Sequence, residues 1–237
     1  MVYITGDTHG DYSRFSQRDA RRLRKGDTLI VLGDFGFLWD GSKQEQQRLK
    51  KLSKKKYTLL FLDGPHENYD MFKEYPISEW NGGRVQRISD NVMHLLRGEI
   101  FQIEGDSYFV FGGGECPDSD LRADSSTTWE EAMPSGEDML RGRSNLQAQG
   151  NKVNFILTHE PSGKAKGYTG LTPVSKSPAA SRLSGVNAYL NLIEDTVQYD
   201  CWYFGSLHLD KALSKRHLAV FRRILPVHDH HKGKHAK

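Results

Sequence analysis

This 237-residue sequence has no membrane-spanning segment, no cysteine spacing typical of disulfides and no strong excess of one charge. The two cysteines, Cys116 and Cys201, have no partner at CxxC or zinc-knuckle spacing, so we interpret them as reduced thiols. No apolar run approaches the length that crosses a bilayer, and no signal-peptide pattern follows Met1. We therefore expect a cytoplasmic protein with no membrane partner.

Charge does not identify a partner. Lys plus Arg total 33 against 30 for Asp plus Glu, which is far from the basic surface of most dedicated nucleic-acid binders. The densest basic run, Arg48–Lys56, follows a helix-like segment, and we interpret it as a solvated face. Nucleic acid stays open as a substrate although charge does not indicate it, and no pattern indicates an oligomeric state.

Two common catalytic motifs are also missing. The glycines at 112–114 lack the GxxxxGK(S/T) arrangement of a P-loop. Neither Ser162 nor Ser206 lies in a GxSxG elbow, which argues against a serine hydrolase.

Strand-like and helix-like segments alternate along the chain, and this alternation predicts an α/β sheet. The expected strands are short runs rich in β-branched and aromatic residues: Val2–Thr5, Thr28–Leu32, Tyr57–Leu62, Val153–Leu157 and Cys201–Phe204. The expected helices between them are Tyr12–Arg24, Ser42–Lys55 and Gly185–Asp195.

The middle of the chain has a different pattern. Arg97-Gly98 and Gly105-Asp106 suit tight turns, so we expect an antiparallel meander of Val92–Leu96, Glu99–Glu104 and Ser107–Phe111. The stretch 112–150 is expected to be a surface excursion that becomes helical from Trp129. We predict one domain over residues 1–226 and a flexible His- and Lys-rich tail over 227–237, whose histidines we leave out of any site.

Chemically active side chains follow each of the five main strands. The sequences at these strand ends are GDTHG at 6–10, GDFG at 33–36, DGPHE at 63–67, THE at 158–160 and GSLH at 205–208. Loops at the carboxyl ends of parallel strands converge on one crevice, so these side chains should meet there. Mixed carboxylate and imidazole ligands suit Mn²⁺ first, with Fe²⁺, Zn²⁺ or Ni²⁺ as alternatives, in a site for one or two divalent ions.

These blocks resemble the calcineurin-like phosphoesterase superfamily, whose pattern is DxH, GD, GNH(D/E), a later His and GHxH. The similarity spans Asp7 to His208. The resemblance implies an α/β fold built as a four-layer αββα sandwich, with two mixed sheets flanked by helices. It also implies a metal-dependent hydrolase acting on a phosphoester substrate, either a monoester or a diester.

Carried over by position, the resemblance assigns four residues to a first metal: Asp7, His9, Asp34 and His208. Asp34 would bridge to a second metal. The other positions of that second metal hold Pro65, His159 and Ser206. Proline offers no side-chain ligand and no N–H, and a short hydroxyl is a poor substitute for imidazole. Both departures therefore fall on one metal.

Activity is expected to be weak or absent as a result. His66 matches the catalytic His of the family and would stabilise phosphoryl oxygens or protonate the leaving group, and Glu67 would orient its neighbours. Phe37 stands where many members have the last Asp of GDxxD. The alternatives left open are a non-catalytic phospholigand- or protein-binding module and an engineered inactive variant. Asp118, Asp120 and Arg122 are candidates for the rim of the cleft.

Overall fold

Two mixed β-sheets face each other in the computed structural model, which describes residues 1–115, 130–168 and 185–230. The first sheet has the order β13 (Leu225–Pro226), β1 (Val2–Thr5), β2 (Thr28–Val31), β3 (Thr58–Phe61), β6 (Val92–Leu95), β5 (Gly83–Arg87) and β4 (Ile77–Trp80). The second has the order β11 (Lys211–Ala212), β12 (His217–Ala219), β10 (Cys201–Phe204), β9 (Phe155–Thr158), β8 (Asp106–Phe111) and β7 (Ile100–Ile103).

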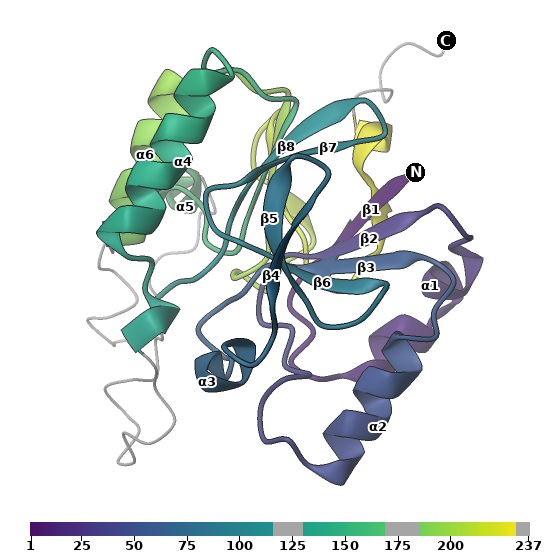
Figure 1. Ribbon diagram of the computed structural model, residues 1–237. Coiled ribbons are helices and arrows are strands. Elements are labelled where there is room, and N and C mark those ends of the chain that lie inside the picture. The colour runs from purple at the N-terminus through teal and green to yellow at the C-terminus, as the bar shows by residue number, and fades with distance from the viewer. Residues whose placement is uncertain (116–129, 169–184, 231–237) are drawn as a thin grey trace, which may run out of the picture.

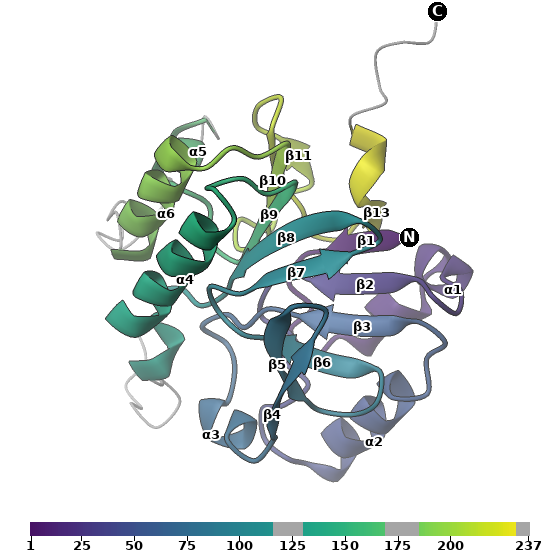
Figure 2. The same cartoon turned by 45° about the horizontal axis from the view of Figure 1, so that its top comes forward.

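Helices cover the outer faces of both sheets. The first sheet carries η1 (Tyr12–Ser16), α1 (Arg18–Arg22), α2 (Lys43–Leu52) and α3 (Tyr69–Phe72), while the second carries α4 (Gly136–Ala148), α5 (Gly163–Gly167) and α6 (Gly185–Thr196) (Figure 1). Figure 2 shows the two helical groups on opposite sides of the paired sheets. The predicted four-layer αββα sandwich is confirmed.

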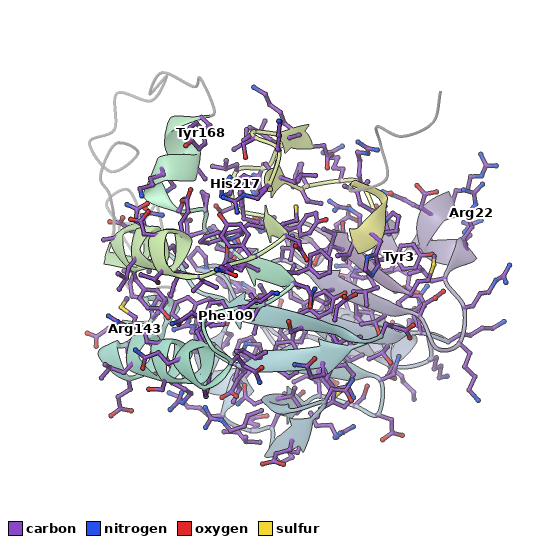
Figure 3. The ribbon with its side chains drawn as sticks, turned by 90° about the horizontal axis from the view of Figure 1, so that it is seen from above. Tyr3, Arg22, Phe109, Arg143, Tyr168 and His217 are labelled. Atoms are coloured by element: carbon purple, nitrogen blue, oxygen red, sulfur yellow. The ribbon has the colours of Figure 1, made fainter. Side chains whose placement is uncertain are left out.

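Three apolar clusters bind the four layers together, because alternate residues of a strand face opposite sides. Ile30 and Leu32 belong to the cluster between the sheets, whereas Leu29 and Val31 pack in the cluster under α2. Phe109 on β8 belongs to the third cluster, beneath α4 and α6, and Figure 3 shows it there. Arg22 of α1 projects into solvent at the far end of the molecule (Figure 3).

The strands that position the candidate site are parallel neighbours. In the first sheet β1, β2 and β3 are parallel, with Ile4 opposite Ile30 and Ile30 opposite Leu60. In the second sheet β9 and β10 are parallel, with Leu157 opposite Tyr203. Their carboxyl ends therefore meet at one edge of the sandwich.

The expected meander was wrong in one respect. β7 and β8 form the expected hairpin, but β6 lies in the other sheet, where it is parallel to β3 and antiparallel to β5. Met93 of β6 pairs with Leu60 of β3, and after β6 the buried side chain of Arg97 binds Asp63 at the end of β3. Arg97-Gly98 is therefore a crossing between the sheets and not a hairpin turn.

Helix bounds also differ from the expectation. The segment expected as one helix over Tyr12–Arg24 divides into η1 and α1, because Gln17 has an extended backbone between them. After a short 3-10 turn, η3 (Glu130–Ala132), α4 begins at Gly136 behind Ser135, whose side chain forms a capping box with Asp138.

The β4–β5 hairpin was not predicted, although Asn81-Gly82 is a strong signal for such a turn. Both residues have positive φ, 47° and 91°. The two strands form an edge of the sheet and are rich in polar residues. They therefore lack the apolar pattern by which the other strands were predicted.

The packed chain continues past residue 226. Val227 is fully buried in η5 (Val227–His230), and its carbonyl accepts a hydrogen bond of 2.7 Å from the Tyr203 hydroxyl. Among the residues that the structure describes, no helix is long and apolar enough to cross a membrane.

Candidate metal centre

The six side chains predicted for the site lie together at the carboxyl ends of five strands. Asp7 and His9 follow β1, Asp34 follows β2 and His66 follows β3. His159 follows β9 and His208 follows β10, so the second sheet closes the site from the other side.

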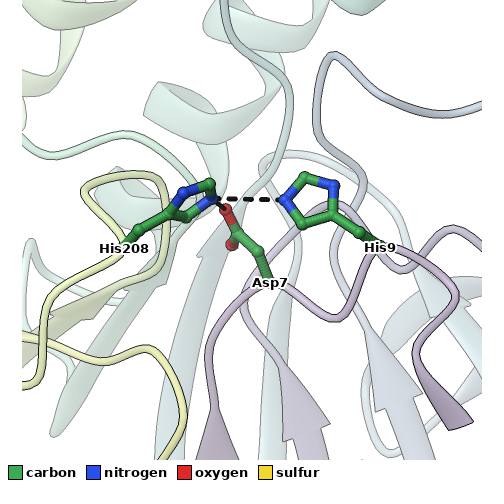
Figure 4. A group of neighbouring side chains, drawn as sticks. All are labelled: Asp7, His9 and His208. Atoms are coloured by element: carbon green, nitrogen blue, oxygen red, sulfur yellow. Dashed lines mark hydrogen bonds and ion pairs between the residues drawn. The ribbon is translucent and has the colours of Figure 1, made fainter.

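Asp7 is the centre of the first group. Its carboxylate is fully buried, and its Oδ2 lies 2.9 Å from His208 Nε2. His208 Nε2 lies 3.2 Å from His9 Nε2, so both imidazole nitrogens point toward the same space. Figure 4 shows Asp7 rising between the two rings.

Asp34 is the centre of the second group. Its Oδ2 lies 2.7 Å from His66 Nδ1 and 3.8 Å from His9 Nε2. Its Oδ1 accepts a hydrogen bond of 2.8 Å from the His66 backbone N–H. His159 joins both carboxylates, because its ligand nitrogen falls within 4.8 Å of ligand oxygens of Asp7 and Asp34.

Three overlapping sets of potential ligand atoms result, each with all atoms within 4.8 Å of one another. They are Asp7 with His9 and His208, His9 with Asp34 and His66, and Asp7 with Asp34 and His159. Each set offers three ligand atoms, from one or two carboxylates and one or two imidazoles, and the shared residues Asp7, His9 and Asp34 link the sets.

Backbone hydrogen bonds hold the loops in pairs. The N–H groups of Thr8 and His9 donate to the Asp34 carbonyl at 3.1 and 2.8 Å, which ties the loops after β1 and β2. The N–H groups of Gly205 and Ser206 donate to the His159 carbonyl at 3.1 and 3.0 Å, which ties the loops after β9 and β10. The loops are therefore preorganised by the main chain.

Three of the candidate ligands have left-handed backbones. The φ angles of His9, Asp34 and His208 are 45°, 43° and 51°. Such conformations cost on the order of 1–3 kcal/mol each for residues other than glycine, and they persist where the surroundings hold them. Stored strain of this kind is typical of functional sites.

Two glycines allow the carboxylates their positions. A Cβ on Gly205 would overlap Asp7 Oδ1, and a Cβ on Gly64 would overlap Asp34 Oδ1. Both glycines follow strands, so any larger residue would push a carboxylate out of the site.

Electrostatics keep both carboxylates charged. Burial raises the pKa of Asp7, but the nearby charge of His159 and the hydrogen bond and charge of His208 outweigh it and hold that pKa well below its ordinary value. Burial raises the pKa of Asp34, but the charge of His159 and the hydrogen bond with His66 outweigh it. The pKa of Asp34 therefore lies below its ordinary value. Burial lowers the pKa of His159, yet the two carboxylates raise it to about 10. The carboxylates thus require nearby positive charge, which a divalent cation can supply.

One further observation fits a cation at this place. Asp7 Oδ1 is a buried carboxylate oxygen that accepts no hydrogen bond from the residues the structure describes, and its near neighbour is His159 Nδ1 at 3.5 Å. Buried oxygens of this kind are rare unless an ion or water satisfies them. Asp7, His9, Asp34 and His208 therefore present a donor set that fits one divalent ion.

The predicted second metal position has fewer side-chain ligand atoms. Pro65 is buried between Gly64 and His66 and has no ligand atom in its side chain. Ser206 Oγ is buried and has no hydrogen-bond partner among residues 1–115, 130–168 and 185–230. At that position Asp34 and His159 offer side-chain ligands beside Asp7, whereas Pro65 offers none.

Glu67 fastens the loop after β2 to the loop after β3. Its buried carboxylate accepts hydrogen bonds from the N–H groups of Phe35 and Gly36. Burial and the charge on Asp34 raise the pKa of Glu67 well above its ordinary value. Glu67 thus orients its neighbours, in agreement with the sequence-based expectation.

A buried ion pair behind the site was missed in the sequence. Asp63 precedes the His66 turn, and its Oδ2 accepts hydrogen bonds from Arg97 Nε at 2.8 Å and from the Tyr69 hydroxyl at 2.9 Å. His94 Nε2 lies 3.1 Å from Asp63 Oδ1. No local signal pairs Asp63 with Arg97, because 34 residues separate them.

Replacing Asp63 by Asn is expected to destabilise the fold by about 3–5 kcal/mol, since it leaves the buried Arg97 without its counter-ion. Burial raises the pKa of Asp63, but Arg97 and His94 lower it far below the ordinary 3.8. The stability that ionised Asp63 contributes is therefore fully present above pH 3.8 and is lost as the pH falls below that value.

Urea unfolding at several pH values tests this expectation. The difference in the free energy of unfolding between wild type and Asp63→Asn should be largest at neutral pH and should become smaller in acid. Asp195→Asn is a matched control, because it removes an exposed ion pair with Lys164 and should leave the midpoint near that of wild type. A difference that becomes larger in acid would contradict the assignment.

Two facing mixed sheets with buried carboxylates and imidazoles at one edge define an α/β protein with a site suited to a divalent cation. The chain matches the family described as calcineurin-like phosphoesterase over residues 1–220, and it belongs to that family. The predicted family resemblance is confirmed. Members of this family use divalent metals, and the family indicates a metal-dependent phosphoesterase. No curated protein matches the chain.

Some predicted residues cannot be compared with the structure. Asp118, Asp120 and Arg122, expected at the rim, lie outside the described residues, as does Cys116. Arg48 was assigned to a solvated face, but it is half-buried and donates to the Gly10 carbonyl at 3.3 Å beside the site.

Proposed function

We propose that this protein is a metal-dependent phosphoesterase with one complete metal position and one impaired position. The observations that support the proposal are the two groups Asp7–His9–His208 and His9–Asp34–His66, which share His9, and a buried oxygen of Asp7 that accepts no hydrogen bond from the described residues. Mn²⁺ is the proposed ion, because carboxylate and imidazole ligands together suit borderline first-row metals.

The ion, when bound, supplies a Lewis acid for phosphoryl oxygens and activates water near neutral pH. The chain supplies orientation and proton transfer. Asp34 holds His66 through two hydrogen bonds, one to the ring and one to the backbone. Because a carboxylate only accepts, His66 Nδ1 is the donor in that contact, and the ring is held to pass a proton to the leaving group.

We propose that turnover is low. A symmetric clamp on the attacking and leaving oxygens needs two ions about 3.5–4 Å apart. Pro65 and Ser206 leave the second position with Asp34 and His159 as its side-chain ligands, and His159 also hydrogen-bonds the Leu32 carbonyl at 3.2 Å. With one complete ligand set, the residues of this chain would hold an ion on only one side of the displacement.

The same two residues favour a second candidate function. A chain with a preserved first position and an impaired second one can hold a phosphorylated ligand without hydrolysing it. The substrate or ligand is a phosphoester in both cases, so activity separates the two.

Metal analysis is the first test. Wild type exchanged into excess Mn²⁺ and then desalted should retain about one ion per chain, since one ligand set is complete. Asp34→Asn should retain none, because it removes the carboxylate shared by both positions. The variant keeps the tail histidines, so the difference between the two proteins reports the site alone.

Equal metal content in wild type and Asp34→Asn would contradict the proposed centre. Two ions in wild type would contradict the impaired second position. Hydrolysis of bis-p-nitrophenyl phosphate by the one-ion protein then distinguishes a slow enzyme from a binding module.

A further inference from the structure

A pocket of about 320 Å³ opens directly beside the candidate metal centre. His9 and His66 form its inner wall, and the loop that links β2 to α2 forms much of the rest. The other lining residues include Phe37, Trp39, Asp40, Ser42, Gln44 and Arg48. The volume lies within the range of small-molecule sites.

Hydrogen bonds hold the backbone of Trp39 in the pocket wall through both its N–H and its carbonyl. The Trp39 N–H donates to Glu45 Oε2 at 2.8 Å, and the Trp39 carbonyl accepts from Asn68 Nδ2 at 2.7 Å. Glu45 is buried on α2 and also accepts from the N–H groups of Asp40 and Gly41. A loop anchored in this way presents its side chains in fixed positions, which reduces the entropy lost on binding.

The lining divides into two chemical regions. Near the metal centre, Arg48 donates to the carbonyl of Gly10, so its guanidinium lies beside the turn that carries His9. Further out lie Trp39, which is partly exposed, and the polar side chains of Ser42 and Gln44. Arginine suits phosphate oxygens, and an indole face suits a flat ring.

We propose that this pocket receives the leaving group of the substrate and that the substrate class is nucleoside monophosphates. The phosphate would lie between the metal centre and Arg48, and the base would stack on Trp39. Every base has a flat face, so stacking accepts all bases, and Ser42 and Gln44 supply hydrogen bonds to ring edges. The hydrolysis of this substrate rests on the proposed function, whereas its binding in the pocket does not.

Binding is measured in Mn²⁺, because without a cation the buried carboxylates of Asp7 and Asp34 would repel the phosphate, and hydrolysis is followed separately in the same samples. Calorimetric titration of the full chain should show that adenosine 5′-monophosphate binds about 10-fold more tightly than ribose 5-phosphate, since stacking of the base adds affinity. Trp39→Leu should remove this difference, and Trp39→Phe should keep most of it. Arg48→Gln should weaken both ligands alike, because it acts on the phosphate.

Equal binding of the two ligands to wild type would overturn the proposal, even if Trp39→Leu failed to fold. An unchanged preference in folded Trp39→Leu would also overturn it. If the preference holds but neither compound is hydrolysed with Mn²⁺, the proposed enzymatic function fails while the pocket assignment stands.

Discussion

Replacing Pro65 by Asn and Ser206 by His is expected to raise the hydrolysis of bis-p-nitrophenyl phosphate in Mn²⁺ by about 100-fold or more. The two changes supply an amide oxygen and an imidazole beside Asp34 and His159. Ser206 already lies next to this space, because its N–H donates to the His159 carbonyl at 3.0 Å and its buried Oγ has no partner among the described residues.

The double variant should also retain about one additional ion per chain. Pro76→Asn with Ser144→His is a matched control, since both residues are exposed and lie away from the site. It should leave metal content and rate unchanged. Brisk turnover by wild type, equal to that of the double variant, would show that the second position is not impaired.

Replacing His66 by Gln in that double variant is expected to lower the rate of hydrolysis of an alkyl phosphoester by about 100-fold or more while metal content stays constant. The reason is that His66 would act as a proton donor to the leaving group, and Gln keeps a hydrogen bond to Asp34 without the ability to transfer a proton at neutral pH. Asp34→Asn should instead lose both the metal and the rate.

Metal analysis beside initial rates separates the two roles. His66 lies 2.7 Å from Asp34 and belongs to one of the three potential ligand sets, so it is also placed to hold an ion. Loss of an ion in His66→Gln would show that His66 is a ligand and would overturn its proposed catalytic role. A substrate with p-nitrophenolate as leaving group needs little protonation, so an alkyl ester should show the larger loss.

Much of the site could be predicted because its signals are local. Each ligand follows an apolar strand within a few residues, and parallel strands end at one edge of a sheet whatever the rest of the chain does. Asp7 and Asp34 follow neighbouring parallel strands of the first sheet, so they had to lie near each other once the strands were identified. His208 follows β10 of the second sheet and joins them because the two sheets face each other. The four layers are what the resemblance to calcineurin-like phosphoesterases implies, and the packing of Ile30 and Leu29 on opposite faces fits them.

Long-range pairing decided the features that were not predicted. β6 pairs with β3 in the first sheet, Arg97 after it binds Asp63, and no residue near Arg97 in the chain announces that partner. The pocket depends on Glu45 and Asn68, which approach Trp39 from two different elements. Arg48 became part of the site only when α2 packed beside the His9 turn.

The sequence by itself determined the family, the layered fold and the set of residues that can hold a cation, because hydrophobic alternation and turn chemistry act over a few residues. The tertiary structure alone decided how these residues are held. The left-handed backbones of His9, Asp34 and His208, the buried oxygen of Asp7 and the wall of the pocket all arise from contacts between segments far apart in the chain. Such contacts form only when the two sheets close on each other, and that closure brings the charged ligands out of water and gives them their chemistry.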